Sequence, residues 1–114
     1  MKLITKAQRE RMLANGNRKE DDCQFDPEPV VKLFTPDANA TWLLAELDPD
    51  DPDLAFGLCD PGLGCPELGS VRLSEIEAVR GKLGLPAERD LYFTPDKTLS
   101  AYAEQARHDG FVRA

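Results

Sequence analysis

The apolar residues in the middle of the chain fall into short runs that are separated by turn-forming residues. The runs at 30–34, 41–47 and 54–59 are rich in the aliphatic, β-branched and aromatic side chains that favour strands, and 69–73 has a weaker pattern of the same kind. Clusters of aspartate, asparagine, glycine and proline lie between the runs, including the acidic stretch 48–53, which we expect to be a rigid loop. Short links favour antiparallel pairing, so the pattern predicts an antiparallel sheet.

The first segment of the chain carries the signals of a short helix. Thr5 and Gln8 have the spacing of a capping box, in which each side chain bonds the backbone N–H of the other residue. Asn15-Gly16 is a typical helix end, because both residue types adopt the left-handed conformation readily. Residues 17–29 are then expected to be a connector, since they are mostly polar and contain prolines that bar regular structure.

Two further helices and a brief strand are expected in the second half. Ser74 and Glu77 form another capping-box pattern, and the helix that they begin should end at the glycines that follow. A brief strand is expected at 91–93, and the last helix should run from about 98 to 108. We therefore predict one α+β domain over residues 1–114, with a four- or five-stranded, mostly antiparallel sheet and about three helices.

The charge of the chain is concentrated in its middle. The chain has 14 basic and 21 acidic residues, so its net charge is −7 at neutral pH. The basic, helical segment 1–20 has a net charge of +4, the acidic, strand-rich segment 21–67 has −11, and the mixed segment 68–114 is neutral. This balance argues against general binding to nucleic acid, which needs a basic surface, and favours a basic protein partner for the acidic segment.

The sequence has no signal of a membrane or secreted protein. No stretch approaches the roughly 18 apolar residues of a membrane span, and no apolar core of a signal peptide is visible near the N-terminus. Cys23, Cys59 and Cys65 form an odd set without a C-x-x-C pair, so we expect free thiols in a cytoplasmic protein. A bridge between Cys59 and Cys65 is the alternative.

Acidic side chains are the main candidates for chemistry. Glu46 and Asp48 are two apart on an expected strand and therefore point to the same side, and Asp60 and Glu67 follow the next strand. Gathered in one place, these four carboxylates would suit Mg²⁺ or Mn²⁺. The favoured alternative is that they lie at solvated strand ends, where charge blocks pairing with other sheet edges.

Other site patterns are incomplete, so we predict no catalytic residue, no metal and no cofactor. The single histidine, His108, falls near the end of an expected helix, where a cation offsets the helix dipole. Gly62-Leu63-Gly64 lacks the last glycine of a dinucleotide-binding loop, and the sequence has no P-loop lysine. Trp42 lies on an expected central strand, where it is either a core residue or an anchor for a partner.

Short segments along nearly the whole chain are similar to those of a known family. They are residues 1–5, 32–38, 40–44, 46–49, 55–60, 62–64, 66–69, 89–91 and 99–102. The sequence resembles a bacterial family of small proteins, known only as a domain of unknown function, that occurs in proteobacteria on plasmids and integrative conjugative elements. The resemblance implies no reaction, because the family has no established activity. Cys65 replaces an expected bulky apolar residue and Pro61 an expected leucine, which weakens any cysteine mechanism.

These observations lead to one hypothesis and two alternatives. We predict a non-enzymatic accessory protein of mobile elements that docks a basic host or element protein, by DNA mimicry of the anti-restriction or anti-CRISPR kind. The residues predicted to contact this partner are Trp42, Glu46, Asp48, Asp50, Asp51, Asp53, Asp60 and Glu67. The first alternative is a metal-dependent enzyme that acts on nucleotide or nucleic acid through Glu46, Asp48, Asp60 and Glu67. The second is a regulatory module that binds through its positive N-terminal helix. The oligomeric state stays open.

Overall fold

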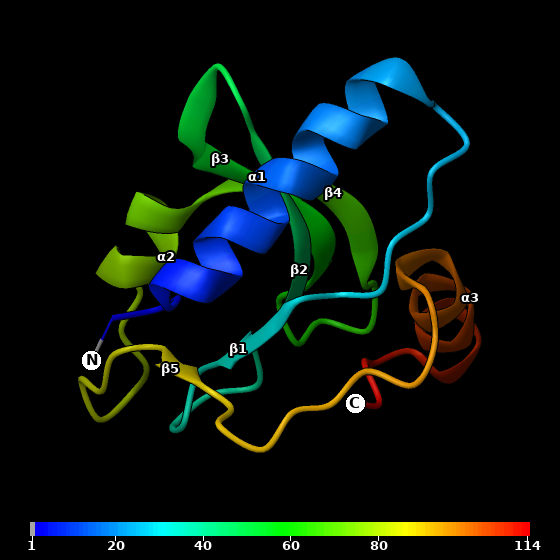
Figure 1. Cartoon of the computed structure of the whole chain (residues 1–114). Coiled ribbons are helices and arrows are strands. Elements are labelled where there is room, and N and C mark those ends of the chain that lie inside the picture. The colour runs from blue at the N-terminus through cyan, green and yellow to red at the C-terminus, as the bar shows by residue number, and fades with distance from the viewer. Residues whose placement is uncertain (1) are drawn as a thin grey trace.

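A five-stranded sheet with strand order β4-β3-β2-β1-β5 forms the centre of the molecule, and all neighbouring strands are antiparallel (Figure 1). The computed structural model describes residues 2–114. The predicted α+β class and antiparallel sheet are confirmed. In chain order the elements are α1 (Lys6–Asp21), β1 (Val31–Phe34), β2 (Thr41–Asp48), β3 (Asp51–Asp60), β4 (Glu67–Arg72), α2 (Leu73–Ala78), β5 (Glu88–Arg89) and α3 (Leu99–Asp109).

Both faces of the sheet carry a hydrophobic core, because successive residues of the central strand β2 point to opposite sides. Leu44 belongs to a buried cluster with Met12 of α1 and Ile76 of α2. Leu43 belongs to a second buried cluster with Tyr102 of α3. Helices α1 and α2 therefore pack on one face of the sheet and α3 packs on the other, which explains why residues 42–45 are apolar on both faces of the strand.

Helix α1 lies with its backbone against β2, and Gly16 makes this close approach possible. A Cβ atom at Gly16 would lie 1.9 Å from the main-chain oxygen of Leu47. One residue earlier, Asn15 Nδ2 donates a 2.8 Å hydrogen bond to the oxygen of Ala45, where the pairing of β2 with β3 shifts register. The predicted helix end at Asn15-Gly16 is wrong, because these two residues serve packing and the helix continues to Asp21.

The acidic stretch 48–53 is a hairpin rather than the predicted loop. Strand β2 ends at Asp48 and β3 begins at Asp51, and in the turn Asp48 Oδ1 accepts a 2.9 Å hydrogen bond from the N–H of Asp50. Pro52 lies inside β3 at a position that is paired with neither β2 nor β4. A proline at such a position costs no ladder hydrogen bond, so it does not interrupt the strand.

The second half of the chain follows the prediction in part. Helix α3 is confirmed and ends at Gly110, whose left-handed φ of 82° closes the helix. The predicted capping box of Ser74 and Glu77 is wrong, because Arg72 is the N-cap of α2 and Glu75 occupies the third helical position. The helix also ends at Ala78, before the predicted glycines. The strand predicted at 91–93 is wrong, because residues 88–89 pair with β1 instead. The chain then turns, with Asp90 Oδ1 accepting a hydrogen bond from the N–H of Tyr92.

The cysteines are free thiols, so the alternative bridge between Cys59 and Cys65 is not formed. Burial raises the pKa of the Cys59 thiol, which disfavours the reactive thiolate. Within residues 2–114, no helix has the length and apolar character needed to cross a membrane.

We predict that Gly16→Ala destabilises the protein, although alanine is the better helix former by about 1 kcal/mol. The new Cβ would collide with the main-chain oxygen of Leu47, and overpacking of this kind costs about 1–3 kcal/mol. Urea unfolding followed by circular dichroism measures the free energy of unfolding. Asn17→Ala, at an exposed position of the same helix, is the matched control and should leave stability unchanged or slightly raised. A Gly16→Ala protein as stable as the control variant would contradict the close approach.

Candidate functional site

The alternative in which Glu46, Asp48, Asp60 and Glu67 gather in one place is wrong. Asp48 lies at the hairpin turn, whereas Asp60 pairs with Thr41 at the opposite end of the hairpin. At about 3.3 Å per residue, the ten residues of β3 hold Asp60 roughly 30 Å from the turn. Glu67 begins β4 beside the end of β3, so it also lies far from the turn. Antiparallel pairing places the start of one strand next to the end of the other, and this separates the two pairs of acids.

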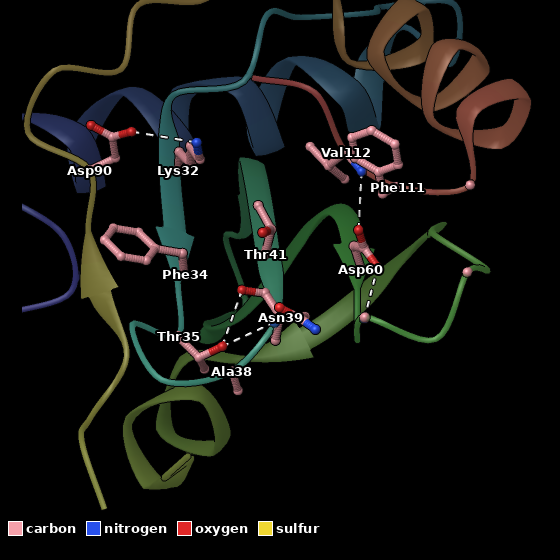
Figure 2. A pocket seen from close by; sticks show the side chains of 14 residues that line it. Lys32, Phe34, Thr35, Ala38, Asn39, Thr41, Asp60, Asp90, Phe111 and Val112 are labelled. Atoms are coloured by element: carbon pink, nitrogen blue, oxygen red, sulfur yellow. Dashed lines mark hydrogen bonds and ion pairs between the residues drawn. The ribbon is translucent and has the colours of Figure 1, made fainter. Parts of the chain in front are cut away.

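Asp60 lies at the edge of a cavity of about 550 Å³ and connects two segments of the chain there (Figure 2). The residue is 4% exposed, and its carboxylate accepts hydrogen bonds of 2.8 Å from the N–H of Gly62 and 3.1 Å from the N–H of Val112. These bonds tie the turn after β3 to the segment after α3. Both carboxylate oxygens of Asp60 are thus hydrogen-bonded to the backbone. Elsewhere in the same cavity, Lys32 Nζ lies 3.5 Å from a carboxylate oxygen of Asp90.

Three further residues predicted to contact a partner have structural roles. Arg72 Nη1 lies 2.9 Å from an oxygen of Asp51 and 3.7 Å from one of Asp53. Asp53 accepts hydrogen bonds from the hydroxyl and the N–H of Ser74, and the hydroxyl bond is the main reason that the pKa of Asp53 is lowered. The two aspartates therefore fasten the start of α2 to β3. Trp42 is 9% exposed and packs in the core beneath α1, which is the first of its two predicted alternatives.

The carboxylates that do gather lie at the hairpin turn, where the last turn of α1 meets it. Oxygens of Glu20, Asp48 and Asp50 all lie within 4.8 Å of one another, and we call this group the acidic end. In the described part of the chain, none of the three forms an ion pair. Sequence reasoning missed Glu20 because it ended the helix too early. The usable signal was the lack of glycine and proline in residues 17–21.

A second cavity, of about 290 Å³, lies beside the acidic end between α1 and the hairpin, and we call it the Glu46 pocket. Glu46 is 8% exposed, and this burial raises the pKa of its carboxyl, an effect that the positive charge of Lys19 opposes. Lys19 forms no ion pair with Glu46, because its Nζ donates hydrogen bonds of 3.0 Å and 2.8 Å to the main-chain oxygens of Cys23 and Phe25. Glu46 is thus a largely buried acid, and the ammonium group of Lys19 is hydrogen-bonded to the main chain instead of to its carboxylate.

The chemistry available here is the binding of a cation. Carboxylates as close as those of the acidic end repel one another, and burial adds a cost to the charged form of Glu46. A positive group from outside the chain would offset both costs.

The side chain of His108 is 90% exposed in the last turn of α3, which packs on the other face of the sheet.

We predict that Glu46→Gln raises the free energy of unfolding at pH 7. Because the pKa of Glu46 is higher in the folded state, the folded protein holds this proton more tightly than the unfolded chain. Wild-type stability should therefore fall as the pH rises from the ordinary glutamate pKa through the raised one, and the neutral amide escapes this loss. The stability difference between Glu46→Gln and wild type should vanish below about pH 4, where the carboxyl group is protonated in both the folded and the unfolded state.

Thermal melts of both proteins between pH 3 and 8 measure this difference. Glu104→Gln, an exposed position on α3, serves as the control and should change little at any pH. A Glu46→Gln protein that is less stable than wild type at pH 7 would mean that the charged carboxylate has a stabilising partner.

The comparisons with known proteins identify the family of the chain but not its activity. The family described as "Protein of unknown function (DUF2958)" matches residues 3–113, which is nearly the whole chain. The comparison with curated proteins finds no match, and neither does the comparison with solved structures. The resemblance to a domain of unknown function is thereby confirmed, and a proteobacterial or plasmid origin stays a prediction. The chain belongs to the DUF2958 family of proteins of unknown function.

Proposed function

We propose that the chain is a non-catalytic binding module whose acidic end docks a basic surface of a partner protein. The observation that carries the proposal is the crowding of Glu20, Asp48 and Asp50 within 4.8 Å without a cation from residues 2–114. Lysine or arginine side chains of a partner would relieve this repulsion. Such contacts steer association and weaken as salt screens the charges.

The proposed contact surface lies at one end of the β2–β3 hairpin, whereas the acidic residues predicted from the sequence lie at both ends. Mimicry of DNA would need carboxylates spaced along one face like phosphates. Asp60 is bonded to two backbone N–H groups, and Asp51 and Asp53 are paired with Arg72 and Ser74, so these acids argue against such a row. We therefore favour local docking over mimicry. A mobile-element origin, an anti-restriction or anti-CRISPR role and a cytoplasmic location stay predictions.

A divalent cation at the acidic end is the second candidate, and it keeps the metal-dependent enzyme as an alternative function. Three carboxylate oxygens within 4.8 Å of one another could each supply one ligand to Mg²⁺ or Mn²⁺. Melting temperatures with and without millimolar MgCl₂ or MnCl₂ separate the candidates, because a ligand that binds the folded state raises the melting temperature. A rise that the Asp48→Asn/Asp50→Asn variant loses would favour the metal.

We expect the wild-type protein to bind an eight-residue peptide of alternating lysine and glycine, with an affinity that falls steeply with salt. Asp48→Asn/Asp50→Asn should weaken binding about two- to thirtyfold at low salt, since each exposed ion pair contributes about 0.2–1 kcal/mol. Its salt dependence should also be shallower. Fluorescence anisotropy of the labelled peptide between 20 and about 300 mM NaCl measures both effects.

The matched control is Glu77→Gln/Glu104→Gln, which removes the same charge from α2 and α3 at exposed positions. This control should bind the peptide nearly as well as wild type. Equal weakening by the two double variants would indicate that only the net charge matters, and the acidic end would then not be a docking site.

A further inference from the structure

Glu46 is an acid that lacks the partners a buried charge needs. It is 8% exposed, and the only favourable charge that acts on it is the more distant Lys19. No donor among residues 2–114 forms a hydrogen bond with its carboxylate, although it lines a cavity of about 290 Å³. Charge on a largely buried side chain without a protein partner is costly, and the oxygens of Glu46 are not enclosed, so they stay open to a group that enters the pocket. A cation or a strong hydrogen-bond donor from outside the chain would offset this cost.

The surroundings of Glu46 favour a cation that is carried on an apolar stem. Leu54 and Phe56 of β3 line the same pocket and are half-buried, and Leu47 of β2 contributes to its lining. Long basic side chains bury an aliphatic stem against such surfaces while the charged end finds its partner. A hydrated metal ion would gain nothing from these apolar residues. The pocket is therefore complementary to an extended basic side chain.

Arginine fits this environment better than lysine. A guanidinium group is less strongly hydrated than an ammonium group, so less is lost when it enters a half-buried pocket. It can also donate two parallel hydrogen bonds to the two oxygens of one carboxylate. Lys19 does not fill this role, because its Nζ is bonded to main-chain oxygens of the connector that follows α1.

The pocket and the acidic end share residues, which places both on one surface. Glu20 and Asp48 belong to the acidic end and also line the pocket. We infer that the Glu46 pocket receives one arginine side chain of a basic partner protein, with the guanidinium group on Glu46 and the stem against Leu54 and Phe56. This inference rests on the proposed function and names its specific contact. The acidic end attracts the partner, and the pocket selects the inserted side chain.

The test is an NMR titration of the ¹⁵N-labelled protein with N-acetyl-arginine amide. Saturable shifts should appear at the backbone N–H groups of Glu46, Leu54 and Phe56. N-acetyl-citrulline amide has the same shape without the charge and should bind the wild-type protein at least about tenfold more weakly. N-acetyl-arginine amide, called arginine amide below, should bind the Glu46→Gln variant more weakly by at least the same factor. Glu104→Gln, the control with the same charge change on α3, should bind like wild type.

A variant that fills the pocket separates its shape from its charge. Ser70 lines the pocket from the edge strand β4 and is exposed, so Ser70→Phe is compatible with the strand and leaves every charge in place. This variant should lose arginine amide binding and keep the salt-dependent binding of the lysine-glycine peptide. Its melting temperature and circular dichroism spectrum establish that it is folded.

Three results would overturn the inference. One is unchanged binding of arginine amide to Glu46→Gln, another is equal binding of the citrulline compound, and the third is equal binding of N-acetyl-lysine amide. If any of these occurs while the peptide still responds to Asp48→Asn/Asp50→Asn, the proposed function stands without the pocket. If wild type binds neither the peptide nor arginine amide, the proposed function fails with it.

Discussion

The contact between the backbones of α1 and β2 is the constraint on which the rest of the structure depends. Gly16 has no side chain to separate the helix from Leu47, and Asn15 bonds the oxygen of Ala45 where the strand pairing shifts. Met12, one turn earlier on the same helix, is completely buried in the core on this face. The position of α1 along β2 is thereby set, and with it the direction in which its last turn projects.

The candidate site is a consequence of this packing rather than of a local motif. The last turn of α1 carries Glu20 to the hairpin turn, where it meets Asp48 and Asp50. The same end of α1 also supplies Gly16 and Lys19 to the lining of the pocket that contains Glu46 of β2. The resulting charge repulsion and burial both oppose folding. Proteins commonly accept such local costs at binding sites, where the partner supplies the compensating groups.

Sequence reasoning succeeded where local chemistry decides the structure and failed where packing does. The capping box of Thr5 and Gln8 is present, and the last helix ends at a left-handed glycine, since both signals act within one turn. Gly16 misled because a glycine at a helix end and a glycine at a close contact look alike in sequence. The separation of Asp60 from Asp48 could have been predicted, because it follows from antiparallel pairing alone. The approach of Glu20 depends on the tertiary contact and could not.

The most direct test of this account is a carboxyl-carbon NMR titration of the aspartate and glutamate side chains, with and without N-acetyl-arginine amide. We expect the pKa of Glu46 to be higher than that of an ordinary glutamate in the free protein. Saturating N-acetyl-arginine amide should lower this pKa, because a bound cation favours the charged carboxylate. A pKa of Glu46 that is ordinary in the free protein and unmoved by arginine amide would contradict the central claim.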